Sequence, residues 1–151
     1  MASTDMRSRK PLTKAEYEAL SSFRYELRRF LKFSEEAAES LGLTPNQHQA
    51  LLAIKGFPGR DQVTNGELAE RLQIKHHSAV GLANRLEAQG LIARKPGDSD
   101  KREVWLRLTR RGAALLEKLT AAHQEELDHL VPELTVLFAR MSARKHSASN
   151  G

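Results

Sequence analysis

The sequence predicts a mostly α-helical fold that contains one small β-hairpin. Through most of the chain, apolar residues recur at three- and four-residue spacing, as they do on one face of an α-helix. Around residues 91–109 the spacing changes to alternation. The stretches "LIARK" and "EVWLRLT" flank the turn-rich segment "PGDSDKR", which is typical of a hairpin with one buried face.

Capping boxes mark three helix starts, because a Ser or Thr is followed three residues later by Glu or Gln. The pairs are Thr13 with Glu16, Thr44 with Gln47, and Thr64 with Glu67. We expect a long first helix over about 14–41, a second over about 44–55 and a short third over 65–72. Gly42 is expected to end the first helix.

The second half of the chain continues with a fourth helix over about 76–89, which Gly90 ends. In the hairpin that follows, Val104, Leu106 and Leu108 are expected to form the buried face. Thr109 can cap a fifth helix over about 110–131. Pro132 is expected to break that helix, and a sixth is expected over about 133–143. Residues 1–12 and 144–151 are predicted to be flexible tails.

Length and composition favour a single globular domain. The chain has 151 residues and no cysteine, so disulfides and thiolate metal sites are excluded. The start "MASTDMRSRKPLTK" has no apolar core, and no apolar run approaches the ~18 residues of a membrane span. We therefore expect a cytoplasmic protein without a membrane role. The sequence has no G-x-S-x-G, no H-E-x-x-H and no phosphate-binding glycine loop, and it predicts neither an enzyme nor a cofactor.

The positive charge is concentrated in the middle third of the chain. The net charge is +5, and residues 71–111 carry ten Lys and Arg against four Asp and Glu, a net of +6. The segments on either side are nearly balanced. A basic surface of this kind points to a polyanion partner, most commonly nucleic acid, although a solvated charged face is the alternative.

The order of elements in the middle is typical of a DNA-binding unit. A short helix, the tight connection "QIK", a second helix and a hairpin make a helix-turn-helix followed by a wing, over residues 44–111. In such units the N-terminal part of the second helix enters the major groove, where short polar side chains fit and carboxylates do not. The residues predicted to read bases are His76, His77, Ser78, Val80 and Gly81.

Basic residues around this helix are predicted to contact the DNA backbone, with solubilising charge as the alternative. They are Lys75, Arg85, Arg94, Arg110 and Arg111. At the wing tip, Asp100, Lys101 and Arg102 are predicted to reach a minor groove, with Asp100 holding Arg102 by a local ion pair. An Asp-x-Asp pair can also suggest a divalent metal. No third ligand follows at useful spacing, so no metal site is predicted.

Three segments resemble the winged-helix MarR-type transcriptional regulators. They are "LGLTPNQHQALLAI", "TNGELAERLQI" and "NRLEAQGLIARKPGDSDKREVWLRLTRRG", and the resemblance covers about residues 41–112 well and the flanking helices in outline. It implies a single domain over 1–151 and a homodimer in which helices 14–41 and 112–143 interlock. It also implies that two winged units read a pseudo-palindrome, and that a small aromatic or phenolic acid is sensed.

The chain departs from the family pattern at four positions. Lys75 stands where a helix-capping Ser or Thr is usual, Gly81 where a larger polar residue is frequent, and Asn84 where Asp is usual. His48 stands where the family often has an aromatic residue, facing the ligand cavity that the resemblance implies.

The residues predicted to line that cavity are Arg24, Arg28, His48 and Leu52. The arginines would pair a ligand carboxylate, and His48 with a pKa near 6.5 would make binding pH-sensitive. The alternative for each is surface or interface polarity.

Together these features predict a sequence-specific, DNA-binding transcriptional regulator. We expect a homodimeric repressor of double-stranded operator DNA that a small ligand releases. Apolar stripes on the first and last helices support the dimer, and packing of these helices within one chain is the alternative. The alternative function is an architectural, sequence-tolerant DNA-binding protein without an effector.

Overall fold

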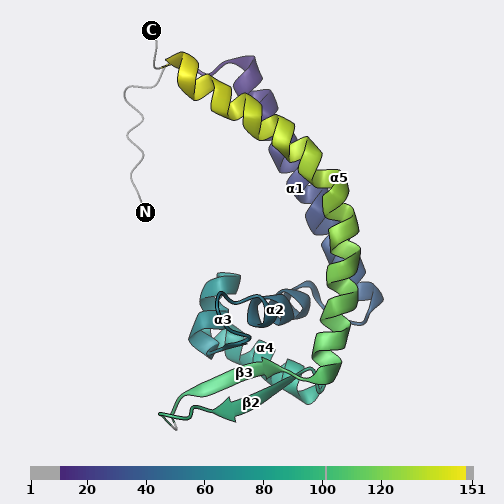
Figure 1. Cartoon of the computed structure of the whole chain (residues 1–151), viewed down its shortest axis with the longest axis vertical. Helices are drawn as coiled ribbons and strands as arrows, with labels where there is room; N and C mark the ends of the chain where they lie inside the picture. Colours follow the sequence, from purple (N-terminus) through teal and green to yellow (C-terminus); the bar gives the residue numbers. More distant parts are fainter. Residues whose placement is uncertain (1–10, 101, 149–151) are drawn as a thin grey trace. The chain divides into compact units, whose positions relative to one another are not determined.

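The computed structural model describes residues 11–100 and 102–148 of the chain. Its described helices and strands are, in chain order, α1 (Lys14–Ser40), α2 (Pro45–Lys55), β1 (Gln62–Val63), α3 (Asn65–Leu72), α4 (His76–Ala88), β2 (Ile92–Pro96), β3 (Val104–Leu108) and α5 (Arg110–Ala148) (Figure 1). The chain divides into two compact units. One comprises residues 32–125, and the other comprises residues 1–31 with 126–151.

The predicted capping boxes are confirmed. The Thr44 hydroxyl accepts from the Gln47 backbone N–H at 3.1 Å, and the Gln47 side chain accepts from the Thr44 N–H at 3.0 Å. The same reciprocal pair joins Thr64 and Glu67 at 3.2 and 2.9 Å. Thr13 and Glu16 make it at the start of α1. Each box satisfies two backbone donors that the first helical turn leaves unpaired, so these starts follow from local sequence.

The predicted break at Pro132 is wrong. A single helix, α5, runs from Arg110 to Ala148 with Pro132 inside it, so the separate sixth helix does not exist. Proline removes one helical hydrogen bond. Leu130 and Leu137, on either side of it, are both buried, and their burial favours a continuous helix. The predicted tail is also wrong over residues 144–148, which are helical, while 149–151 and 1–10 lie outside the described residues.

The strands form one antiparallel sheet in the order β1-β3-β2. β1 pairs with β3 at Gln62↔Arg107 and Val63↔Leu106, and β2 pairs along the whole of β3. The predicted buried face is only partly correct. Leu106 is fully buried and Leu108 half-buried, but Val104 is 36% exposed. The pattern fails towards the tip because β1 ends at Val63 and the outer part of β3 has no third strand beside it.

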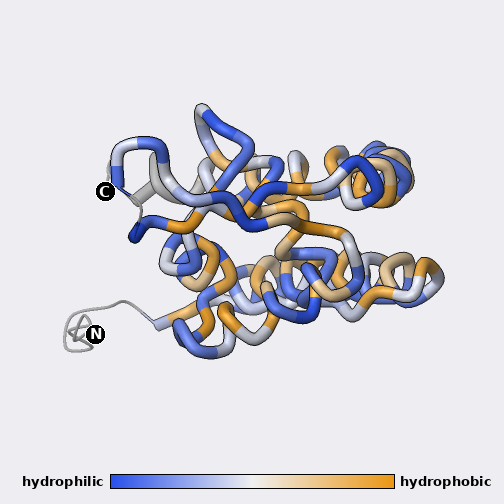
Figure 2. The backbone as a smooth tube through the Cα atoms, turned by 90° about the horizontal axis from the view of Figure 1, so that it is seen from below, coloured by the Kyte–Doolittle hydropathy of each residue, from blue (hydrophilic) through white to orange (hydrophobic). Residues whose placement is uncertain are grey.

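The core of the unit that spans residues 32–125 is built from every element in it. The largest fully buried side chains are Leu51, Ile54 and His48 of α2, Val63 of β1, Leu68 of α3, Leu86 of α4, Ile92 of β2, Leu106 of β3 and Leu119 of α5. Hydrophobic and hydrophilic positions alternate along the helical coils in Figure 2, as expected of helices that bury one face. This core fixes which face of α4 is left for solvent.

The other unit pairs the first part of α1 with the second part of α5. Phe23 and Phe138 pack with ring centroids 6.0 Å apart, and Leu130 and Leu137 are buried. Many large apolar side chains of this unit stay exposed, namely Leu12, Tyr17, Leu20, Tyr25, Leu31, Leu127, Val131, Val136, Phe138 and Met141. None of the helices in the described ranges combines the length and apolarity needed to span a bilayer.

Candidate nucleic-acid interface

Helix α4 presents a small, polar, carboxylate-free first turn. His76, His77 and Ser78 are exposed, and the first turn contains no acidic residue. Lys75 occupies the N-cap with extended backbone, and its side chain makes no capping hydrogen bond. The first backbone N–H groups of α4 therefore lack a side-chain acceptor from the cap. They add partial positive charge to this end of the helix.

The opposite face of α4 packs into the core as predicted. Ala79, Leu82, Ala83 and Leu86 are all buried. Among the predicted base-reading residues, Val80 and Gly81 are half-buried at the edge between the two faces. A Cβ placed at Gly81 would lie 3.6 Å from a terminal nitrogen of Arg85, so the exposed Arg85 side chain lies against the space that the glycine leaves.

The wing tip is ordered by Asp100. Its carboxylate accepts from the backbone N–H of Arg102 at 3.0 Å and lies 3.6 Å from Arg102 Nε, which confirms the predicted ion pair. The Arg102 side chain is 94% exposed. The Gly97 N–H donates to the Glu103 carbonyl at 2.8 Å and closes the turn. Lys101 lies outside the described residues.

Two of the predicted backbone-contacting arginines have partners within the chain. Arg94 of β2 donates to the Asn84 side-chain carbonyl and lies 3.4 Å from the Glu87 carboxylate, both on α4. Arg111 donates to the Gln89 carbonyl at the end of α4, at 3.0 Å. A guanidinium carries five N–H donors, so these bonds leave donors for a phosphate. Contact of Arg94 and Arg111 with DNA stays a prediction, as it does for the exposed Lys75 and Arg110.

Hydrogen bonds join the start of α5 to the end of the helix-turn-helix. The Thr109 hydroxyl donates to the Gly90 carbonyl at 2.6 Å and accepts from the Gly112 N–H at 3.1 Å, so Thr109 caps α5 as predicted. Gly112 approaches the backbone of Leu91 so closely that a Cβ would overlap the Leu91 carbonyl oxygen. Gly90 has φ of +73°, a left-handed conformation that glycine adopts at little cost. These contacts connect the end of α4 directly to α5.

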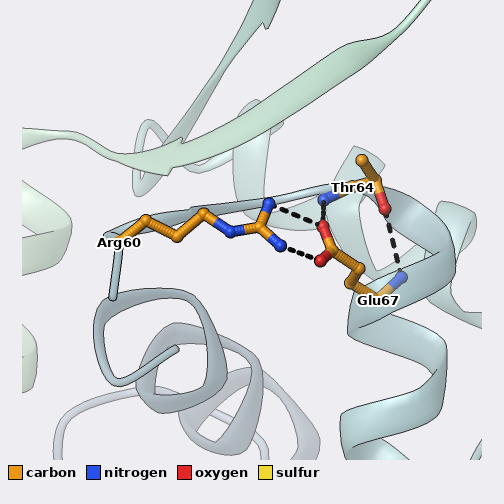
Figure 3. A network of polar contacts seen from close by, with 3 residues as sticks. All are labelled: Arg60, Thr64 and Glu67. Carbon is orange, nitrogen blue, oxygen red and sulfur yellow. Dashed lines mark hydrogen bonds and ion pairs between the residues drawn. The ribbon is translucent and has the colours of Figure 1, made fainter. Parts of the chain in front are cut away.

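A cluster around Arg60 was not predicted from the sequence. Arg60, in the loop after α2, donates to both carboxylate oxygens of Glu67 on α3, one of them at 2.9 Å (Figure 3). Its guanidinium also lies over the rings of Phe57 and Trp105, 4.3 and 4.9 Å from their centroids. Glu67 lies seven positions after Arg60, and no periodic pattern links the two residues. A loop arginine beside an N-terminal helix glutamate was the only available signal.

The electrostatics of Glu67 reflect these partners. Partial burial raises the pKa of this carboxyl group. The Thr64 backbone N–H and the Arg60 guanidinium outweigh that effect, so the pKa of Glu67 lies below its usual value. Glu67 is therefore ionised at neutral pH and holds Arg60 in a charge-assisted, two-point contact.

His48 lies in the core and not at an open cavity. It is 2% exposed, and its ring centroid is 4.9 Å from that of His123 on α5. Burial, helped by the neighbouring His123, lowers the pKa of His48 to about 4. The prediction that His48 titrates near 6.5 and confers pH sensitivity around neutrality is therefore wrong. Sequence spacing did not show that this α2 position is enclosed by other helices.

His123 connects two helices through its two ring nitrogens. Nδ1 lies 2.6 Å from the Leu119 carbonyl oxygen, an acceptor, so Nδ1 carries a proton and donates. Nε2 lies 2.8 Å from the hydroxyl oxygen of the buried Ser34 of α1, and the two groups share a hydrogen bond. This satisfies a polar pair that would otherwise destabilise the core.

The other predicted ligand residues are exposed. Arg24 and Arg28 lie on the part of α1 that belongs to the second compact unit, and Leu52 on α2 is 41% exposed. A cleft of about 500 Å³ within the unit of residues 32–125 is lined by Lys55 of α2 and, on α5, by Ala113, Leu116, Glu117, Thr120, Ala121 and Gln124. In the part of the chain that the structure covers, no three His, Asp or Glu side chains come together as a metal site.

Fold and surface together define a winged helix-turn-helix protein. The family model for the MarR family matches residues 41–103. The chain is 33% identical over 109 residues to the HTH-type transcriptional repressor MdtR of Bacillus subtilis (strain 168), covering 70% of this chain and 68% of that protein. The chain therefore belongs to the MarR family of transcriptional regulators, as the sequence resemblance predicted.

Solved structures share the fold. AbsC, a MarR family transcriptional regulator from Streptomyces coelicolor, superposes with a TM-score of 0.70 at 22% identity, over 93% of this chain and 97% of that one. The S. aureus MepR F27L mutant, solved bound to an oligodeoxyribonucleotide, gives a TM-score of 0.62 at 24% identity, over 91% and 99% of the two chains.

Proposed function

We propose that this protein is a homodimeric repressor that reads a pseudo-palindromic operator with α4 in the major groove and the wing tip in the flanking minor groove. The observation that carries the proposal is the exposed first turn of α4, with His76, His77 and Ser78 and no carboxylate, next to a hairpin that carries Arg102 fully in solvent. Imidazole and hydroxyl groups supply donors and acceptors for base edges. A narrow minor groove attracts arginine.

The basic residues around α4 are proposed to supply most of the affinity. Lys75, Arg85 and Arg110 are exposed, and Arg94 and Arg111 keep free donors beside the same helix. Each phosphate neutralised releases counterions, so log Kobs should fall against log salt by about 0.9 for every contact. Val80 and Gly81 complete the proposed base-reading set, and Val80 is proposed to contact a thymine methyl.

The homodimer is proposed from the apolar surface of the unit formed by residues 1–31 and 126–151. Tyr17, Leu20, Val131, Val136 and Phe138 are each about half exposed there. Large exposed apolar areas more often mark an interface than a surface that stays in contact with solvent. A second copy is the proposed occupant, with residues 14–41 and 112–143 as the dimerisation segments. Its two-fold axis would place half-sites one DNA turn apart, about 10 bp.

The ligand is proposed to be a small aromatic or phenolic acid, whose carboxylate would pair with the exposed Arg24 and Arg28 of α1. Such a ligand would release DNA by binding better to dimers whose recognition helices are wrongly spaced. Repression is proposed because the relative MdtR is a repressor. A regulator of this kind acts in the cytoplasm.

The decisive experiment is selection of fragmented genomic DNA on the purified protein at ~150 mM salt, followed by sequencing. We expect a few sites that share an inverted repeat with ~10 bp between half-site centres. Broad recovery without a motif would favour the architectural alternative. Sedimentation of wild type and Phe138→Glu tests the dimer separately, because a charge in the interface should give monomers. A wild-type monomer would contradict it.

A further inference from the structure

We infer that Arg60 is a positioning residue that holds the outer half of the wing against α3 and thereby sets where Arg102 meets DNA. The part of this inference that concerns DNA rests on the proposed function. The geometry behind it is independent of DNA. It consists of the Arg60 contacts to Glu67 on α3 and to Trp105 on β3.

Among the described residues, the outer half of the wing has no third strand beside it. β1 pairs with β3 only at Leu106 and Arg107. Towards the tip, Trp105 and Val104 pair only with β2, at Lys95 and Pro96. Pro96 has no N–H to give to the ladder, and Val104 is 36% exposed. A two-stranded ribbon of this kind is marginally stable by itself. Going towards the tip, Trp105 is therefore the last residue of β3 whose side chain has a described contact, through Arg60, with the helix-turn-helix.

The Arg60 guanidinium is suited to this link because it is planar. Its edge donates to both carboxylate oxygens of Glu67, while its face lies over aromatic rings. Glu67 itself is held by Thr64 through the two hydrogen bonds of the capping box (Figure 3). Phe57 lies 4.3 Å from the guanidinium and belongs to the same loop as Arg60. The contacts therefore run from α3, through Arg60, to β3.

We call the contacts of Arg60 with Glu67 and Trp105 the brace, and this brace bears on DNA recognition. α3 and α4 pack together as the helix-turn-helix, while Arg102 lies only three residues from Trp105. Fixing Trp105 to α3 thus holds the wing tip at a set position relative to α4. Base and minor-groove contacts tolerate little misplacement. Loss of the brace should therefore weaken the Arg102 contact without removing any group that touches DNA.

The first test needs no DNA. Amide hydrogen exchange of the full chain is compared between wild type and Arg60→Ala. We expect exchange to become roughly tenfold faster at the amides of residues 95, 97 and 103–105, with the amides of α4 unchanged, because local opening is a property of weakly supported segments. Unchanged exchange in the wing, or equal acceleration throughout the unit of residues 32–125, would overturn the inference.

The second test is a double-mutant cycle on operator binding with Arg60→Ala and Arg102→Ala. We expect each single variant to bind operator about tenfold more weakly. The slope of log Kobs against log salt should become shallower by about one, the value for one phosphate contact. The double variant should lose little more than either, because both changes remove the same contact. Additive losses would overturn the inference. If Arg102→Ala has no effect, the wing contact of the proposed function fails, and hydrogen exchange alone then decides whether the brace exists.

Conservative variants of Trp105 separate positioning from folding. Trp105→Phe keeps an aromatic face for the guanidinium, and Trp105→Leu keeps bulk but removes that face. We expect Trp105→Leu to reproduce the Arg60→Ala loss and Trp105→Phe to restore most of the affinity and salt slope. Equal losses in both, tracking their melting temperatures, would reduce Trp105 to a structural role and overturn the inference.

Discussion

The rings of His48 and His123 lie 4.9 Å apart, one on α2 and the other on α5. The pKa of His48 falls to about 4 because the ring is buried and a second imidazole adjoins it. Its ordinary value of 6.5 applies to the unfolded chain, which therefore binds a proton first as pH falls. The contribution of neutral His48 to stability is complete above about pH 6.5 and is lost between 6.5 and 4.

We predict that replacing His48 with phenylalanine removes this part of the pH dependence. Denaturant unfolding at pH 7, 5.5 and 4.5 should show wild type losing stability relative to His48→Phe as the pH falls, because the variant has no ring nitrogen to protonate. Parallel pH profiles for the two proteins would contradict the assignment to His48.

Glu67→Gln is predicted to separate the Arg60 ion pair from the helix cap. Gln47 makes the same capping box at α2, so glutamine at 67 keeps the cap and removes only the charge. Both partners are about 30% exposed, so we expect a cost of about 1 kcal/mol at pH 7.

This cost should itself depend on pH. The pKa of Glu67 is lowered in the fold, so the stability it contributes is present above its unfolded pKa and disappears as pH falls through its folded pKa. Chemical unfolding across pH 7 to 3 should therefore bring Glu67→Gln and wild type together in acid. A constant difference would show that the lost stability came from the cap.

Gly112→Ala is predicted to destabilise the fold by about 1–3 kcal/mol, since the new Cβ overlaps the Leu91 carbonyl and forces backbone movement. Gly66→Ala in α3 is the matched control. Its Cβ would come no closer than 3.9 Å to Thr64, and alanine favours a helix by up to about 1 kcal/mol over glycine. Thermal unfolding should move in opposite directions for the two variants. Equal shifts would argue against the close approach at 112.

Pro132→Ala is predicted to raise the free energy of unfolding by about 1 kcal/mol or more, because it restores an N–H for the carbonyl four residues earlier in α5. Pro45→Ala serves as control, since Pro45 occupies the first turn of α2, where that N–H has no helical partner. A melting temperature that falls in Pro132→Ala would mean that a kink at this position is needed.

Arg102→Ala is predicted to weaken operator binding and to reduce its salt slope by about one, because the 94% exposed side chain would lose one phosphate or minor-groove contact. Lys55→Ala removes the same charge from an exposed residue of α2 that is proposed neither to contact DNA nor to lie in a dimerisation segment. Titrations at several salt concentrations should separate the two variants. Equal behaviour would remove the wing from the proposed function.

Local sequence was sufficient for the helix starts, the hairpin and the faces of α4. Thr44 and Gln47 are three residues apart, so their capping bonds form wherever the chain leads afterwards. Likewise, the three- and four-residue spacing of Ala79, Leu82, Ala83 and Leu86 puts them on one side of a helix. The remaining positions of α4 therefore form its exposed polar face.

Tertiary structure decided the features that depend on segments far apart in the chain. Pro132 is tolerated because Leu130 and Leu137 on either side of it are buried. The pKa of His48 is lowered because the fold buries the ring and, in addition, α5 places His123 against it. Arg60 acquires its role only when α3 and β3 bring Glu67 and Trp105 to the same guanidinium. Hydrogen bonds within a turn are specified by adjacent residues. Burial and charge pairing depend on which distant side chains the completed fold brings into contact.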